Sequence, residues 1–231
     1  MARTTKHVLG NQRGKIGEVV GHIVDGVQIY TAHTDAVHNP RTPKQVAHRA
    51  CFTAVTGLGR SLGSSIRLGF RNEAAKHKLT SPFHLFVHRN MPASSYDPDT
   101  HTVSVNYQEV SVACGTTPFV GFSSANFSEA LKVSAAFTPY SDTPGADDTD
   151  SVYLVVYIPD LGMSATAVAS RLDGTVTATL PSVFGGRTAH VWGFVRTSVE
   201  DSLFIEASGT LLVPGECSSS FYLGTGTILT A

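Results

Sequence analysis

The sequence is poor in cysteine and tryptophan, and this scarcity excludes disulfide-stapled and zinc-finger architectures. Its 231 residues include 3 Cys and 1 Trp. The three cysteines, Cys51, Cys114 and Cys217, are an odd number at wide spacing, which argues against a disulfide framework and against a zinc knuckle. A reducing compartment is the simplest interpretation.

Long apolar runs are also lacking. The longest strongly apolar stretch, Val152–Ile158, is far shorter than the roughly 20 residues that a membrane-spanning helix requires. The first residues, Met1–Lys15, are polar and basic, unlike a secretory signal. We therefore expect no signal peptide, no membrane partner, and a cytoplasmic or virion location. The 42% hydrophobic and 15% charged content indicates an ordered, globular chain.

Acidic residues are scarce in the first 91 positions. This segment holds 13 Lys+Arg against 4 Asp+Glu, whereas the rest of the chain holds 4 Lys+Arg against 14 Asp+Glu. The two parts carry formal charges of +9 and −10, which sum to the net charge of −1. Such asymmetry predicts units with different partners, or attraction between copies of the chain.

The first regular element of the basic segment is a β-hairpin. Glu18–Val24 and Val27–Thr34 flank Asp25-Gly26, a pair typical of two-residue hairpin turns. This pairing puts one set of side chains on one face of the hairpin, namely Val20, His22, Val24, Val27, Ile29 and Thr31. Because an isolated hairpin is marginally stable in water, we expect this one to pack on something else.

Helices follow the hairpin. Thr42–Gln45 has the pattern of a capping box with Pro at the first helical position. Gly57, Gly59 and Gly63 interrupt the apolar stripe that follows, and they predict either a break or close backbone approach. Further helices are expected after Ser64-Ser65, and from Ser81-Pro82 to about Met91-Pro92.

Beyond residue 95, strand-like runs recur between turn signals and predict an antiparallel immunoglobulin- or fibronectin-like β-sandwich. The expected strands are Thr102–Tyr107, Glu109–Cys114, Ala130–Phe137, Ser151–Ile158, Thr175–Leu180, His190–Thr197 and Ser202–Val213. The tail Gly215–Ala231 could add a strand to its own sheet or to a neighbouring copy. We therefore expect an α+β chain with a basic hairpin-and-helix segment (1–94), a β-sandwich domain (95–214) and a C-terminal tail (215–231).

Three sequence patterns resemble catalytic or metal-binding motifs, but each lacks a feature that its motif requires. Gly59–Gly63 matches the G-x-S-x-G nucleophile elbow but lies at the end of an expected helix. His84 and His88 share a helix face, but position 85 is Leu where H-E-x-x-H needs an acid. Asp147–Asp150 lacks the ligand spacing of an EF-hand. We expect no enzyme, no catalytic residue, no metal site and no cofactor.

The basic segment is instead the candidate interface. Its proposed contact residues are Arg41, Lys44, Gln45, Arg49, Arg60, Arg67 and Arg71. These side chains would attract nucleic acid in a salt-sensitive, sequence-independent way. The interleaved aromatics Phe52, Phe70, Phe83 and Phe86 are spaced like core residues, however. An acidic protein surface is therefore the favoured partner, and the −10 part of the chain itself supplies one.

Several of these motifs occur together in one known family. Gly14–Gly17, Asn39–Phe52, Ser81–Phe83, Val152–Pro159 and Val191–Val195 resemble a family of bacterial and phage-associated proteins known as domain of unknown function 6266. The resemblance covers most of residues 10–214. It implies a basic hairpin-plus-helix head followed by an immunoglobulin-like β domain, and it implies no activity.

The favoured function is therefore a non-enzymatic structural or assembly protein. We expect a phage-like virion component that forms a homo-oligomer or docks on a particle through its basic segment. One alternative is a nucleic-acid-binding or packaging protein that uses the same arginines. Another is a host-side module that grips a protein or glycan through loops such as 139–150.

Overall fold

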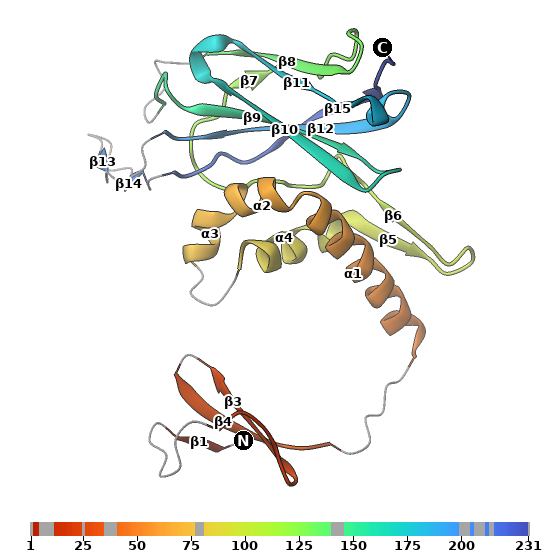
Figure 1. Cartoon of the computed structure of the whole chain (residues 1–231), viewed down its shortest axis with the longest axis vertical. Coiled ribbons are helices and arrows are strands. Elements are labelled where there is room, and N and C mark those ends of the chain that lie inside the picture. The colour runs from red at the N-terminus through yellow and green to blue at the C-terminus, as the bar shows by residue number, and fades with distance from the viewer. Residues whose placement is uncertain are drawn as a thin grey trace. The chain divides into compact units, whose positions relative to one another are not determined.

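The computed structural model describes residues 2–4, 12–24, 26–34, 41–76, 81–139, 146–198, 204–205, 211–212 and 215–230. They belong to two compact units, residues 1–42 and residues 43–231 (Figure 1). The division therefore falls within the basic segment, between Thr42 and Pro43, whereas we expected a boundary at 94/95. The reason is that the helices after Pro43 share a core with the β strands.

The first unit is a four-stranded antiparallel sheet. Its strands are β1 (Ala2–Thr4), β2 (Gly14–Ile16), β3 (Val19–Val24) and β4 (Val27–Ala32), in the order β1-β4-β3-β2. The register pairs Val20 with Thr31 and His22 with Ile29, which confirms the predicted hairpin face. Gly26 has a φ of 75°, as a tight turn requires. Its predicted turn partner, Asp25, lies outside the described residues.

A buried glutamine holds the sheet to the segment before it. The Gln28 side chain donates from Nε2 to the Gln12 carbonyl (2.7 Å) and accepts at Oε1 from the Gln12 N–H (3.0 Å). The side chain thus forms hydrogen bonds with both the N–H and the carbonyl of Gln12, as the backbone of a neighbouring strand would. Gln28 is only 1% exposed, so both bonds are largely shielded from water.

The second unit begins with four helices. They are α1 (Pro43–Ser61), α2 (Gly63–Gly69), α3 (Arg71–Lys76) and α4 (Pro82–Asn90), followed by the 3₁₀ turn η1 (Met91–Ala93). Pro43 and Pro82 are first residues, as the cap patterns predicted, and the Ser81 hydroxyl accepts from the His84 N–H. No helix in the described part of the chain is long and apolar enough to cross a membrane.

The glycines of α1 have two different roles. Gly57 and Gly59 lie inside an unbroken 19-residue helix, so the predicted break is absent there. At Gly59 a β-carbon would lie 2.9 Å from the Phe83 ring and 3.0 Å from the Phe86 ring, so this glycine permits α4 to approach closely. The helix ends before Gly63, where α2 begins.

The rest of the second unit is antiparallel sheet. One four-stranded sheet has the order β10-β9-β12-β15 and comprises β9 (Ser151–Ile158), β10 (Met163–Ser170), β12 (Thr188–Arg196) and β15 (Phe221–Thr227). A second, of order β11-β8-β7, comprises β7 (Gly121–Phe122), β8 (Lys132–Thr138) and β11 (Thr175–Thr179). Two-stranded pairs are β5 (Ser94–Asp97) with β6 (Thr102–Val105), and β13 (Phe204–Ile205) with β14 (Leu211–Leu212). Short 3₁₀ turns are η2 (Arg171–Asp173) and η3 (Ser182–Phe184).

The four-stranded sheet is covered on both faces. Tyr153, Val155 and Trp192 pack with the helices in one core. Leu154 and Val156, the alternating residues of β9, pack against the three-stranded sheet in the other core. The second unit thus has three layers, with helices below the sheets in Figure 1. The α+β class is confirmed in this form.

Several strand predictions were confirmed and one was wrong. Ser151–Ile158 is a strand with the predicted bounds, and the tail contributes β15 to its own sheet. Glu109–Cys114 forms no strand, because its amides bond to scattered partners. The Cys114 N–H donates to the Gly69 carbonyl, and the Val112 N–H donates to the Ser220 hydroxyl. Of the predicted strand Ser202–Val213, the structure describes only β13 and β14.

Candidate functional site

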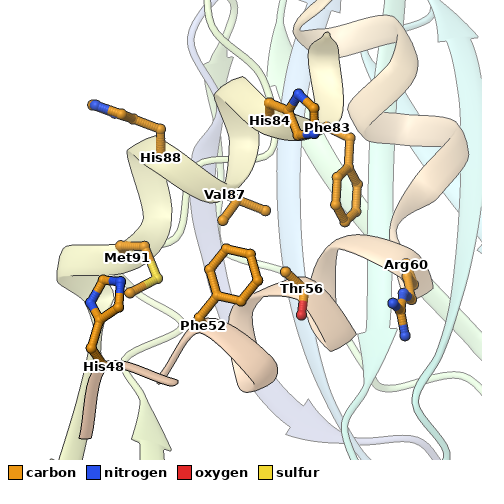
Figure 2. A pocket seen from close by; sticks show the side chains of 9 residues that line it. All are labelled: His48, Phe52, Thr56, Arg60, Phe83, His84, Val87, His88 and Met91. Atoms are coloured by element: carbon orange, nitrogen blue, oxygen red, sulfur yellow. The ribbon is translucent and has the colours of Figure 1, made fainter. Parts of the chain in front are cut away.

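A groove with a volume of about 480 Å³ lies between α1 and α4 on the helical layer. Figure 2 shows Phe52 of α1 facing Val87 of α4 across it. The complete lining consists of His48, Phe52, Thr56, Arg60, Phe83, His84, Val87, His88 and Met91. Its floor is apolar and its rim carries imidazole and guanidinium groups.

The helical repeat produces this groove. His48, Phe52, Thr56 and Arg60 recur every four residues, so they form one row along α1. From His48 to Arg60 this row spans about 18 Å at the rise of an α-helix. A neighbouring stripe of α1, with Cys51, Val55 and Leu58, is buried. One face of α1 thus packs in the core, and the row from His48 to Arg60 lines the groove.

The opposite wall, contributed by α4 and the first residue of η1, follows the same spacing. Phe83, Val87 and Met91 form one row at four-residue intervals, and His84 and His88 form the next. Figure 2 shows His88 pointing away from the floor, at the rim. Both histidines nevertheless line the groove, in agreement with the predicted shared helix face. No cluster of three or more metal-ligating side chains occurs within the described segments.

Phe52 differs from the other aromatics of the basic segment. Phe70 and Phe86 are fully buried and make an edge-to-face contact with ring centroids 6.0 Å apart, as their core-like spacing predicted. The Phe52 side chain is 49% exposed, so its predicted core position is wrong. An aromatic ring left half in water at the base of a groove is a favourable anchor for a partner.

The structure separates the predicted contact residues. Arg60 and Arg67 meet at a second hollow of about 370 Å³ that adjoins the groove through Phe83. Lys44, Gln45 and Arg49 lie in the first two turns of α1 and line neither hollow. Arg71 begins α3, and Arg41 belongs to the first unit. Arg60 and Arg67 were predicted as contact residues from their charge, whereas Phe52 was not, although its four-residue spacing from His48 and Thr56 was visible in the sequence.

Part of the charge on this surface is not neutralised by the carboxylates that the structure describes. Among the residues that the structure describes, no carboxylate forms an ion pair with Lys44, Arg60, Arg67 or Arg71. Lys76 is the exception, because its Nζ lies 3.0 Å from Glu73 and 3.2 Å from Glu216. Desolvation opposes its charged form, but the bonds to both carboxylates outweigh it and raise the pKa of Lys76.

The patterns considered for chemistry lie in ordinary surroundings. Ser61, the centre of the G-x-S-x-G match, ends α1 and donates from its hydroxyl to the Gly57 carbonyl at 3.2 Å. That is a helix-internal bond rather than a strand-to-helix elbow. Cys217 is buried, and burial raises the pKa of its thiol to about 12, which suppresses the reactive thiolate.

Comparison with known proteins identifies a matching family, but that family has no described activity. Residues 11–206 match a family whose description is "Family of unknown function (DUF6266)". The match spans both units and ends before β15. No curated protein and no solved structure matches the chain.

Proposed function

Because the chain belongs to the family of unknown function DUF6266, which brings no activity with it, we propose from the surface alone that the protein is a non-enzymatic assembly protein. In this proposal the groove between α1 and α4 is its docking surface. The partner is an acidic protein surface that carries an apolar side chain.

One observation carries the proposal: a half-exposed aromatic floor is combined with arginines that pair with none of the carboxylates that the structure describes. The exposed Phe52 ring supplies apolar area that gains free energy when covered. Arg60 and Arg67 supply charge that steers an acidic partner and sets its orientation. Buried aromatic and arginine side chains are also the residues that dominate binding energy at protein interfaces.

The finer parts of the proposal concern the scaffold and its setting. We propose that the two stacked sheets form an immunoglobulin-like body that holds the helical layer rigid. The two-sided burial of β9 supports a rigid body. The resemblance of motifs such as Asn39–Phe52 to a family of bacterial and phage-associated proteins supports assembly within a phage-like virion.

Sedimentation velocity at low and high ionic strength tests this function. We expect the wild type to form species larger than the monomer at low salt and to dissociate as salt rises. The double variant Arg60→Glu/Arg67→Glu removes the cationic rim and should remain monomeric. Lys132→Glu/Arg187→Glu changes the net charge equally on the β layers and should assemble like the wild type. A wild type that stays monomeric at low salt and high concentration would contradict the proposal.

A nucleic-acid partner is the second candidate, favoured by the exposure of Lys44, Arg60, Arg67 and Arg71, none of which pairs with a carboxylate in the described part of the chain. A mobility-shift titration at several salt concentrations separates the two. Binding that weakens steeply with salt and is lost in Arg60→Glu/Arg67→Glu would support this candidate. Absence of binding at low salt would eliminate it.

A further inference from the structure

The turn between β10 and β11 exposes an apolar side chain at its apex. Leu172, in η2, is 62% exposed, the highest fraction among the large apolar side chains that the structure describes. Its neighbours in the chain point elsewhere: Arg171 is fully buried, and Asp173 bonds back to Ser170. Leu172 therefore stands alone as an apolar knob.

This knob is held rigidly from below. The Arg171 guanidinium lies 3.0 Å from the Asp150 carboxylate, and neither side chain is exposed. Arg171 also donates to the Pro118 carbonyl at 2.7 Å. Ser170 and Asp173 form a capping box around the turn, which ends at Gly174 with a φ of 67°. Because the apex is already ordered, the turn loses little conformational entropy when a partner binds it.

Carboxylates lie near the knob. The Ser170 hydroxyl donates to the Asp148 carbonyl at 3.0 Å, so the exposed Asp147 and Asp148 lie beside the turn. Asp147 accepts from the Thr149 hydroxyl and then from its N–H, and these bonds lower the pKa of the Asp147 carboxyl. The turn thus offers one apolar group within a negatively charged rim.

The turn and the groove are complementary in shape and in charge. The groove has an apolar floor at Phe52 and a cationic rim, whereas the turn has an apolar apex at Leu172 and an anionic rim. Both belong to the unit of residues 43–231, where the turn joins β10 to β11 at the upper end of the sheets in Figure 1 and α1 and α4 lie below the sheets. Their separation excludes a contact within one copy.

We propose that the Leu172 turn of one copy docks in the α1–α4 groove of a second copy. This inference rests on the proposed assembly function and names its partner. Because the two surfaces differ, the contact is heterologous and joins copies head to tail. Each added copy presents a new free groove and a new free turn, so the product is a closed ring or an open filament.

Two half-exposed anchors allow a complementation test. Phe52→Gln disables the groove and leaves the turn intact, whereas Leu172→Asn disables the turn and leaves the groove intact. For each variant alone, the association constant measured by sedimentation velocity should fall by about tenfold or more, as expected when a central interface anchor is removed. An equimolar mixture should form dimers and nothing larger, because each pair retains a single intact junction.

Val183→Asn is the matched control. Val183 is 56% exposed on η3, outside both surfaces, so its replacement should leave assembly unchanged. Circular dichroism and thermal melting of all variants verify that each is folded. Wild-type-like assembly of Leu172→Asn would overturn the inference, as would a mixture that stays monomeric. If Phe52→Gln and Arg60→Glu/Arg67→Glu still abolish assembly in that case, the proposed function stands without this partner.

Discussion

At the scale of single residues, His190 links the core to solution pH. Its ring stacks on Tyr107 with centroids 4.0 Å apart, and its Nδ1 lies 2.8 Å from the Tyr222 hydroxyl. Burial lowers the pKa of His190 below its ordinary value. The neutral ring is therefore the form that the folded protein accommodates.

We predict that the free energy of unfolding falls as pH drops below the ordinary histidine pKa of about 6.5, partly through this residue. With a depressed folded pKa, the unfolded chain binds the proton first, so stability is full above that pH and is lost below it. Urea titrations at pH 7.5, 6.0 and 5.0 should show a smaller decrease for His190→Gln than for the wild type. Parallel pH profiles would contradict the prediction.

The buried pair of Arg171 and Asp150 gives a second prediction. Asp150 accepts from the Ser198 N–H at 3.2 Å as well as pairing with Arg171, and both side chains are inaccessible. Asp150→Ala should lower the free energy of unfolding by about 3–5 kcal/mol, because it leaves a buried guanidinium without its counter-charge.

The double variant Asp150→Ala/Arg171→Met serves as its control. Removing both charges should recover much of the loss measured by urea unfolding, since an apolar pair avoids the desolvation cost. Equal destabilisation by the single and double variants would show that the pairing of the charges is not the origin of the effect.

At the scale of elements, α1 contains a matched pair of glycines. We predict that Gly57→Ala raises the free energy of unfolding by up to about 1 kcal/mol, because a β-carbon there meets nothing within 4 Å and alanine favours the helix. Gly59→Ala should lower it by about 1–3 kcal/mol, because the added carbon meets the rings of Phe83 and Phe86. Thermal and urea unfolding measure both changes, and shifts of the same sign would refute the interpretation.

Local signals predicted the elements that carry their own markers. The Pro-led helix starts, the hairpin register and β9 were all visible, because caps, turns and runs of β-branched residues act locally. The strand β10 was missed, since its sequence Met163–Ser170 is rich in Ala and Ser, which have little preference for strands. It is a strand because all eight of its residues pair with β9, a tertiary cause.

The candidate site was predictable only in part, for the same reason. Arg60 and Arg67 were recognised by charge, which is a property of the residue itself. The exposure of Phe52 depends on how far α4 stands from α1, and the aromatic spacing alone indicated burial. The four-residue row through Phe52 became meaningful once α4 supplied the opposite wall.

At the scale of the whole molecule, stability is concentrated in the second unit. Every residue of the two apolar cores lies beyond position 54. We predict that a variant lacking residues 1–42 unfolds cooperatively, with a thermal midpoint within about 2 °C of that of the corresponding transition in the full chain. It should also retain assembly, because the groove and the Leu172 turn both remain.

Differential scanning calorimetry of the two proteins makes this comparison. A midpoint lowered by about 5 °C or more, or the loss of a cooperative transition, would show that the first unit stabilises the second. Retained folding with lost assembly would place a necessary contact in residues 1–42.

The pairing of β15 with β12 has a consequence for synthesis on the ribosome. Thr188 to Gly193 of β12 bond to residues 221–227 on one edge and, for the most part, to β9 on the other. A nascent chain that has emerged only to residue 220 therefore carries β12 with one row of amides and carbonyls still open. Such an open edge pairs readily with other chains. Emergence of residues 221–227 from the exit tunnel is thus the step that covers this edge of β12 and removes it as a pairing site for neighbouring polypeptides.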